Sequence, residues 1–289
     1  MAAMGVPKNE VLTSAEWNRF APSFMQLAMV GPGIIPAQRM VDLAGALAPF
    51  SKATAIIDMG CGPGQITNEV LAKCNGQVPS TARVIAADNS ESMLEQIRAR
   101  RIREIEQGTP SWERVEVLQT DIHNCLPIED GSVSHVLAGF VFFLLPDPKQ
   151  ALDSVKRILA PDGLLATSSW QSSEWSDFMY YPLKVRPDLV IPKRPEEWAT
   201  ETGTRAALEA AGYRDIQVYT VQSFMPFEDH DDICRFILLK FPPAARASAQ
   251  MTQEELITTQ QLMIADLKEM YPIVPNRMSG TAIIATCRK

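Results

Sequence analysis

The sequence predicts an α/β fold, in which short apolar strands alternate with amphipathic helices. The first observation is a glycine-rich turn within residues 55–67 (AIIDMGCGPGQIT), which joins an apolar strand to a helix. The second is that the apolar strands expected at 83–87 and 115–119 are also followed closely by an acid. The third is size, because 289 residues, 46% of them hydrophobic, can bury one large core and still carry insertions.

The turn after the first strand has a glycine at every second position: Gly60, Gly62 and Gly64. Without Cβ atoms these residues let a ligand approach the backbone, and amides at the start of the next helix favour electron-rich groups. The spacing does not fit the dinucleotide fingerprint, and no lysine follows to form a phosphate loop. The turn therefore indicates another nucleotide-type cofactor, although a tight turn without any ligand could use the same glycines.

Two motifs carry a resemblance to a known family. The pattern D-x-G-x-G-x-G from Asp58 to Gly64 resembles motif I of the class I S-adenosylmethionine-dependent methyltransferases. The segment 157–170 (RILAPDGLLATSSW) is similar to the R-x-L-x-P-G-G-x-L segment of the ubiquinone-biosynthesis-type group, with Asp162 replacing a glycine. The resemblance implies S-adenosyl-L-methionine as cofactor, no metal, and a Rossmann-like sheet of seven strands with helices on both faces and helical lid insertions.

The resemblance also assigns roles around the cofactor. The glycine turn would wrap its methionine part, Asp88 would hold both ribose hydroxyls, and Asp121 would meet the adenine amino group. Met93 could equally be a core residue and Asp121 a simple turn residue. The expected cofactor-binding residues are Asp58, Gly60, Cys61, Gly62, Gly64, Asp88, Asn89, Met93, Asp121 and Ile122.

The remaining elements follow from apolar runs and from helix signals. Strands are expected at 55–57, 83–87, 115–119, 133–139, 164–170, 216–221 and 281–286. Asp147 and Pro148 have the residue types of an N-cap and a first helical position, and capping-box spacing occurs at 13–16 and 252–255. Further helices are expected at 36–47, 90–106 and 206–211, directly after Gly64, and before a stop at Pro242–Pro243.

These elements suggest how the chain is divided. Residues 1–50 are expected to form an N-terminal helical lid, and 51–289 the methyltransferase domain. Insertions at about 171–200 and 229–276 lie beside strand ends, where α/β proteins place substrates, and are expected to cover the acceptor. Aromatic side chains in these regions are candidates for binding it, with ordinary core packing as the alternative: Trp17, Phe20, Phe140, Trp170, Trp175 and Phe178.

Charge and missing signatures favour a small-molecule acceptor over nucleic acid. Lys and Arg total 27 against 34 for Asp and Glu, a net charge of -7, and the basic run Arg98–Arg103 is interpreted as a solvated face of ion pairs. Nucleic-acid amino-methyltransferases carry an Asn/Asp-Pro-Pro-Tyr/Phe signature after strand four, which this chain lacks, and it contains no Pro-Cys dipeptide. The expected partner is a small organic molecule.

The chemistry is predicted to depend on proximity and orientation. None of the three histidines, His123, His135 and His230, can be assigned as a base, which favours a thiol, amine or carboxylate acceptor. Sequence segments such as GFVFFLLPDP and LLATSSWQSSEW resemble those of fungal secondary-metabolite enzymes of the gliotoxin bis-thiomethyltransferase type. This resemblance implies S- or O-methylation. A cyclase that binds the cofactor without transferring methyl, and a non-catalytic binder, remain as alternatives.

The five cysteines form no C-x-x-C pair and are interpreted as reduced thiols. The first residues lack the apolar region of a secretory signal, and the longest apolar run, 136–145, is too short to span a bilayer. We therefore expect a cytoplasmic protein that does not enter a membrane. The sequence leaves open whether it is a monomer or a homodimer.

Overall fold

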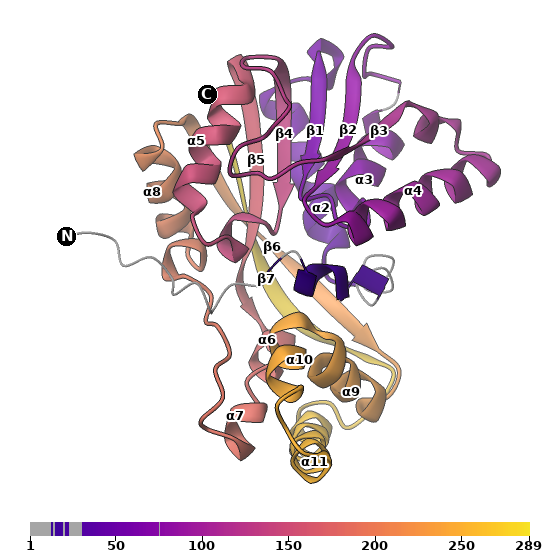
Figure 1. The fold of residues 1–289 in the computed structure, drawn as a ribbon, viewed down its shortest axis with the longest axis vertical. Coiled ribbons are helices and arrows are strands. Elements are labelled where there is room, and N and C mark those ends of the chain that lie inside the picture. The colour runs from indigo at the N-terminus through magenta and orange to yellow at the C-terminus, as the bar shows by residue number, and fades with distance from the viewer. Residues whose placement is uncertain (1–12, 14, 20, 23–30, 75) are drawn as a thin grey trace.

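The computed structural model describes residues 13, 15–19, 21–22, 31–74 and 76–289. Its centre is one seven-stranded sheet with strand order β3-β2-β1-β4-β5-β7-β6 (Figure 1). Neighbouring strands run parallel except β7, which is antiparallel to both β5 and β6. The strands are β1 (Ala55–Met59), β2 (Arg83–Asp88), β3 (Val115–Gln119), β4 (Val133–Gly139), β5 (Leu159–Ser173), β6 (Arg214–Phe227) and β7 (Asn276–Arg288). The predicted seven-stranded sheet is confirmed.

Helices cover both faces of this sheet because its strands are apolar on both sides. On one face α2, α3 and α4 pack against residues such as Ile56, and on the other α5 and α8 pack against residues such as Ile57. The helices of these two layers are α2 (Ile34–Leu47), α3 (Gln65–Cys74), α4 (Glu91–Glu106), α5 (Pro148–Ile158) and α8 (Glu201–Ala210).

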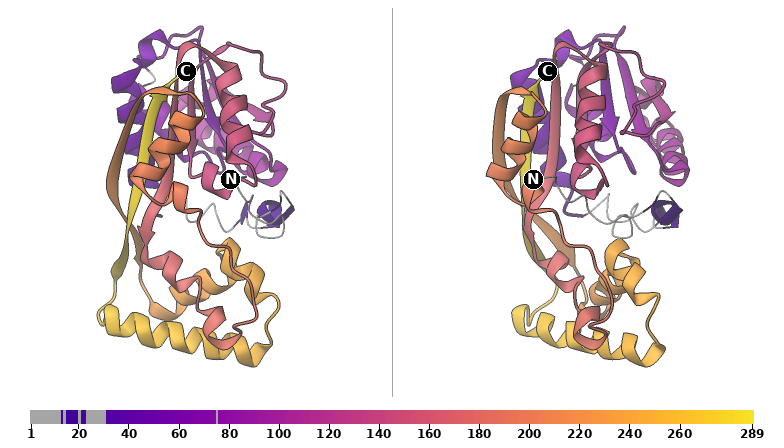
Figure 2. Two further views of the ribbon diagram at one scale, coloured as in Figure 1. Left: turned by 90° about the vertical axis from the view of Figure 1, so that its left-hand side faces the viewer. Right: turned by 60° about the vertical axis from the view of Figure 1, so that its left-hand side comes forward.

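A second group of helices lies beyond the end of the sheet and is called the cap here. Strands β5, β6 and β7 are far longer than β1 to β4, and they extend past the sheet to carry these helices (Figure 2). A separate apolar core holds the cap together, with Trp175, Met225 and Met278 at its centre. The cap consists of α6 (Glu174–Phe178), α7 (Pro182–Val185), α9 (His230–Lys240), α10 (Pro242–Ser248) and α11 (Gln253–Met270).

The last three strands were expected to be much shorter than they are. The sequence predicted 216–221 and 281–286, whereas β6 and β7 remain paired as far as Phe227 and Asn276. The apolar pattern weakens where the two strands leave the sheet, but their backbone hydrogen bonds continue as a two-stranded ribbon.

One helix of the cap was not expected at all. Pro242–Pro243 was interpreted as a helix stop, and α9 does end at Lys240, but Pro242 is also the first residue of α10. Proline fits the first helical turn because the backbone N–H that it lacks would have no hydrogen-bond partner within the helix there. The capping box at Thr252 is present, since Glu255 N donates to Thr252 Oγ1 and Thr252 N donates to the Glu255 carboxylate.

The part of the expected lid that the structure describes has two roles. Helix α2 buries Met40 and Val41 in the core under the sheet, so it belongs to the covering layer of the sheet. Residues 15–19 form a helical stretch behind the 13–16 capping box, in which Thr13 N donates to the Glu16 carboxylate over 2.8 Å. Only this first stretch remains a lid candidate. None of the described helices is long and apolar enough to cross a membrane.

Candidate functional site

The glycine turn between β1 and α3 has no room for a side chain at Gly60 or Gly64, but it has free space at Gly62. Gly60, Gly62 and Gly64 have φ values of +70°, +49° and +80°, which side chains other than glycine rarely adopt. A Cβ at Gly60 would lie 2.6 Å from Val141, and one at Gly64 would lie 2.7 Å from Ile97. At Gly62 a Cβ would meet no atom within 4 Å. The backbone is therefore accessible at Gly62, where a ligand can approach it.

Asp88, at the end of β2, connects this turn to the next loop. Its Oδ2 accepts a hydrogen bond from Gly62 N over 3.0 Å, and its Oδ1 accepts one from Ser90 N over 2.9 Å. Burial raises the pKa of the Asp88 carboxyl, and the backbone N–H groups of Ser90, Gly62 and Asn89 oppose that shift. A carboxylate offers about four acceptor positions, so each oxygen retains capacity for one further donor. The Asp88 carboxylate and the accessible backbone of Gly62 thus form one polar site.

Asp58 supports the turn from within the protein. Its Oδ2 accepts hydrogen bonds from Thr67 N (2.9 Å) and Thr67 Oγ1 (2.7 Å) in the first turn of α3. The side chain is 4% exposed, and burial raises the pKa of Asp58 to about 6. The structure places this carboxylate against the N-terminal end of α3, where negative charge is favourable. Its expected contact with a cofactor stays a prediction.

Arg100 fixes the same turn from the opposite side, and sequence reasoning missed it. The guanidinium is 4% exposed in a helix where Arg98 forms the expected exposed ion pair with Glu91. Arg100 Nη1 donates to the carbonyls of Pro63 (2.9 Å) and Gly64 (3.0 Å). The interpretation of the whole basic run as a solvated face is therefore wrong at this residue.

A periodic signal could have identified Arg100. It follows Met93 and Ile97 at the spacing of one helix face, and both of these side chains are buried. Its guanidinium lies 5.0 Å from the centre of the Trp112 ring, and its Nε is 3.3 Å from the Glu104 carboxylate. An arginine can occupy such a position because these groups replace water around its charge.

Asp121 lies at the end of β3 and is paired with a histidine. Its Oδ1 accepts a hydrogen bond from His123 N over 2.9 Å and lies 2.7 Å from His123 Nδ1. Ile122, between them, packs in the core under α5. The expected adenine-side residues Asp121 and Ile122 are thus at the same edge of the sheet as Asp88, since β2 and β3 are parallel neighbours.

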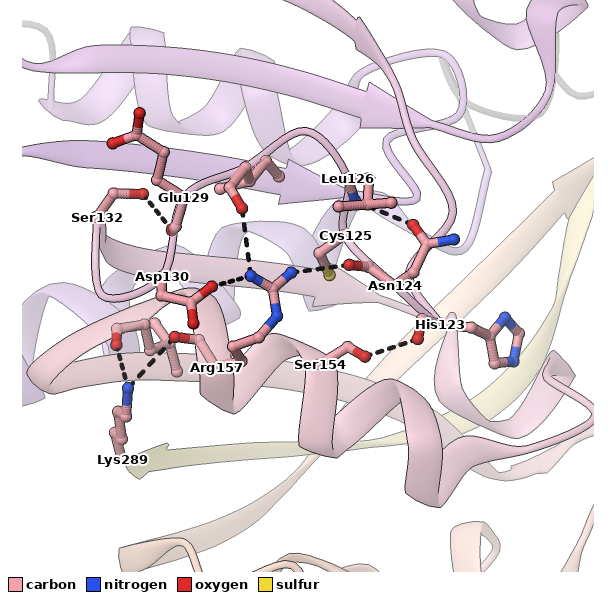
Figure 3. A network of polar contacts seen from close by, with 12 residues as sticks. His123, Asn124, Cys125, Leu126, Glu129, Asp130, Ser132, Ser154, Arg157 and Lys289 are labelled. Atoms are coloured by element: carbon pink, nitrogen blue, oxygen red, sulfur yellow. Dashed lines mark hydrogen bonds and ion pairs between the residues drawn. The ribbon is translucent and has the colours of Figure 1, made fainter.

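Figure 3 shows how the loop after His123 is attached to α5. Arg157 Nη2 donates to the carbonyl of Asn124 over 2.8 Å, and its Nη1 pairs with Asp130. Ser154 Oγ donates to the carbonyl of His123 over 2.6 Å. The loop that carries Asp121 is therefore held in place by side chains of one helix.

The other expected cofactor residues differ in their accessibility. Asn89 is exposed next to Asp88, whereas Met93 and Cys61 are 3% and 6% exposed. Burial raises the pKa of the Cys61 thiol, so this group stays protonated. Met93 is buried on α4, and its expected contact with the cofactor stays a prediction.

An aromatic group stands beside the glycine turn, at the ends of β4 and β5. Phe140 has a φ of +59°, unusual for a bulky residue, and its N–H donates to Ser168 Oγ over 3.1 Å. Its ring stacks on that of Trp170 with centroids 4.4 Å apart, and Trp175 meets Trp170 edge-on at 4.9 Å. Three of the expected acceptor-binding residues are thus brought together.

These aromatic residues are not equally available to a ligand. Phe140 and Trp170 are half-buried, whereas Trp175 and Phe178 are 1% and 3% exposed and fill the core of the cap. Trp17 is half-buried in the N-terminal helical stretch. Phe20 lies outside the described residues. Phe140 and Trp170 therefore remain candidates for direct contact with an acceptor.

Two of the histidines are occupied by structural contacts. His135 Nε2 lies 3.0 Å from the carbonyl of Ala48, and burial lowers the pKa of this ring. His230 Nε2 lies 2.7 Å from the carbonyl of Tyr271 in the cap. Within the described residues, no group of three His, Cys, Asp or Glu side chains has the arrangement of a metal site.

Comparison with known proteins identifies relatives over different lengths of the chain. Residues 57–167 match the family described as "Methyltransferase domain". Methyltransferase ucsB of Acremonium sp. is 28% identical over 98% of this chain and 98% of its own length. Acetylaranotin bis-thiomethyltransferase of Aspergillus terreus is 26% identical over 64% of this chain and 63% of its own length.

Solved structures extend the fold comparison to the whole chain. A putative methyltransferase from Bacillus halodurans has a TM-score of 0.54 at 17% identity, covering 86% of this chain and 98% of that one. The [4+2]-cyclase SpnF also has a TM-score of 0.54, at 18% identity, covering 99% of this chain and 98% of its own. At these identities the structures support the fold alone.

Proposed function

We propose that this protein, whose residues 57–167 match a methyltransferase domain, is an S-adenosylmethionine-dependent enzyme that methylates a thiol or hydroxyl group of a small secondary metabolite. The observation that carries the proposal is the accessible backbone of Gly62, which donates a hydrogen bond to Asp88. In the same turn Gly60 packs against Val141, the chain neighbour of Phe140 in the Phe140–Trp170 pair. The relative from Aspergillus terreus, a bis-thiomethyltransferase by name, supports a sulfur acceptor.

The residues at the sheet edge fit S-adenosylmethionine. A Cβ would fill the free space at Gly62, so glycine there suits a cofactor that lies against the backbone. The Asp88 oxygens, each already holding one backbone N–H, would accept the ribose hydroxyls. Asp121 and Ile122 would flank the adenine. When bound, the cofactor supplies a methyl group activated by the positive charge of its sulfonium.

The acceptor sulfur or oxygen would receive this methyl group and give up its proton to water, with Gly62 and Asp88 holding the cofactor and the Phe140–Trp170 pair facing the acceptor. The protein contributes alignment, since holding two reactants in a reactive geometry can supply about 7–11 kcal/mol. A thiol with a pKa of about 8.5 ionises enough near neutral pH to need little help from a base.

A cyclase that binds the same cofactor without transferring methyl is the second candidate. The [4+2]-cyclase SpnF has a similar fold, so the fold alone does not separate the two functions. Both functions require cofactor binding, but only methyl transfer releases S-adenosylhomocysteine. Detection of this product therefore separates them.

The test begins with calorimetric titration of the protein with S-adenosylmethionine and S-adenosylhomocysteine, followed by incubation with a panel of thiols and phenols. We expect binding and release of S-adenosylhomocysteine with at least one acceptor. Asp88→Asn should weaken cofactor binding by roughly ten-fold, because a charge-assisted hydrogen bond is worth about 1.5–3 kcal/mol. Asp153→Asn, at an exposed acid of α5 that pairs with Lys149, is the matched control and should bind normally.

Each outcome of this test bears on a separate part of the proposal. Binding without S-adenosylhomocysteine release from any acceptor would favour the cyclase. Equal affinity in the wild type and Asp88→Asn would remove Asp88 from the site. DNA or RNA methylated as fast as a small molecule would contradict the small-molecule acceptor.

A further inference from the structure

Arg194 is a half-buried cation that contacts the backbone of Trp170, one of the two stacked aromatic residues. It lies in the segment that returns from α7 towards the sheet, and its Nη1 donates to the backbone carbonyl of Trp170. The Trp170 ring stacks on Phe140 at the ends of β5 and β4. The guanidinium is therefore held at the backbone of Trp170, whose ring the proposed function places against the acceptor.

The charge of Arg194 is only partly compensated by the protein. A guanidinium carries five N–H donors, and the hydrogen bond to the Trp170 carbonyl uses one. Across the described parts of the chain, Arg194 forms no ion pair with an acid, in contrast to Arg186, which pairs with Asp188 at 2.7 Å. Several donors of a half-buried Arg194 thus remain available.

The groups that act on Arg194 come from α6 and the turn after it. Burial lowers the pKa of Arg194, while Asp177 and Tyr180 favour its charged form. Burial in turn raises the pKa of Asp177, and Arg194 opposes that shift. The two charges act on each other at a distance without making a direct pair. The cation therefore still lacks a contacting anion to replace the water it has lost.

We propose that Arg194 binds a carboxylate or phenolate group of an aromatic acceptor whose ring packs against Phe140 and Trp170. The planar fork of a guanidinium matches an oxyanion and can donate two hydrogen bonds at once. The neighbouring stacked pair supplies an aromatic face of the kind that planar ligands prefer. This inference rests on the proposed function, because it assumes that the acceptor stands at the ends of β4 and β5.

A purely structural role for Arg194 makes a different prediction. If its charge served only to balance Asp177 inside the cap, removal of either residue would have the same effect. If Arg194 binds a ligand, Asp177→Asn should leave anion binding intact or strengthen it, because a competing negative charge is lost.

The experiment measures binding of benzoate and its neutral counterpart benzamide to the full chain saturated with S-adenosylhomocysteine, by calorimetry. We expect the wild type to bind benzoate at least ten-fold more tightly than benzamide. Arg194→Met should abolish this preference, and Arg194→Lys should retain part of it. A second arm compares 4-nitrophenolate with nitrobenzene, so that carboxylate and phenolate recognition are distinguished.

The controls separate this inference from the proposed function. In Arg194→Met the affinity for S-adenosylhomocysteine should stay within two-fold, which shows that the variant is folded. If the wild type binds S-adenosylhomocysteine but prefers neither anion, the inference is overturned while the methyltransferase proposal stands. Preference retained in Arg194→Met, or lost equally in Asp177→Asn, also overturns it. Failure to bind S-adenosylhomocysteine at all would instead contradict the proposed function.

Discussion

The cofactor half and the acceptor half of the candidate site consist of different kinds of chemical groups. On the cofactor side, the ends of β1 to β3 present a glycine turn and carboxylates that bind backbone N–H groups, as in the contact of Gly62 with Asp88. On the acceptor side, the ends of β4 and β5 and the cap present aromatic side chains, as in the stack of Phe140 on Trp170. The first half depends on backbone shape and the second on side-chain identity.

This difference agrees with the extent of the family match. A backbone turn closed by glycines tolerates little change, and the family match covers residues 57–167, where the turn lies. The cap lies outside that match, and its aromatic residues can change without loss of the sheet. A substitution on the cofactor side should therefore affect all acceptors equally, whereas one on the acceptor side should affect only some.

The largest effect is expected at Arg100. Arg100→Met removes the donors of the Pro63 and Gly64 carbonyls and leaves Glu104 without its partner. Loss of one partner from a buried polar network should lower the free energy of unfolding by about 3–5 kcal/mol and weaken cofactor binding. Urea denaturation and calorimetry measure the two effects.

The neighbouring Arg98→Met provides the control for this prediction. Arg98 forms an exposed ion pair with Glu91 on the same helix, so its loss should change stability by about 0.5 kcal/mol or less. Equal losses of stability in the two variants would show that the contacts of Arg100 with the turn stabilise the protein no more than an exposed ion pair does.

Gly62→Ala should come next. The new Cβ would occupy the free space at the turn, and the positive φ would strain any residue with a side chain. We expect cofactor affinity to fall by roughly a hundred-fold, or about 2.7 kcal/mol, by calorimetric titration. Gly108→Ala is a matched control, because Gly108 has a φ of +89° and also no atom within 4 Å of its Cβ position. It should lower stability to a similar extent and leave cofactor affinity unchanged.

How far the sequence determined these features differs between the halves. The order of strands and helices up to Gly139 and the glycine turn were predictable, because each depends on a short stretch of sequence. The position of Arg100 depends on the helix face and on the turn lying beneath it, 36 residues away in the chain. An interpretation of the sequence by charge alone could not distinguish Arg100 from Arg98.

The cap was less predictable because its structure depends on contacts between distant segments. Helix α10 begins at a proline that also follows the end of α9, and local sequence supports either interpretation. The ribbon of β6 and β7 pairs Phe227 with Asn276 across three intervening helices. The stack of Phe140 on Trp170 likewise requires β4 to end beside the part of β5 that holds Trp170, since Gly139 pairs with Ser168.

The halves should also respond oppositely to pH. The pKa of Asp58 is raised by burial to about 6, so its folded form binds a proton more tightly than the unfolded chain does. The free energy of unfolding of the wild type relative to Asp58→Asn should therefore rise, by roughly 2–3 kcal/mol, as the pH falls from 7 to 4. Denaturation of both proteins at the two pH values measures this.

Asp266 on α11 gives the opposite case within the cap. Hydrogen bonds from Tyr181 and Lys184 lower the pKa of Asp266, so its stabilising effect is lost as the pH falls. The wild type should accordingly lose stability relative to Asp266→Asn on acidification, by less because this carboxylate is partly exposed. A common sign for both residues would contradict the assigned environments.

The smallest effect on cofactor affinity is expected at Trp170, which makes it the sharpest test of the division between the halves. Trp170→Leu removes the ring that stacks on Phe140, and such aromatic contacts are worth about 0.5–1.5 kcal/mol. For an acceptor bound between these rings, KM should rise by roughly three- to ten-fold, while cofactor affinity stays within two-fold. Phe236→Leu, at an aromatic pair elsewhere in the cap, should alter neither quantity. A parallel loss of cofactor affinity in Trp170→Leu would mean that the two halves are not independent. The change would then reach the glycine turn from the strained backbone at Phe140 through Val141, which packs against Gly60.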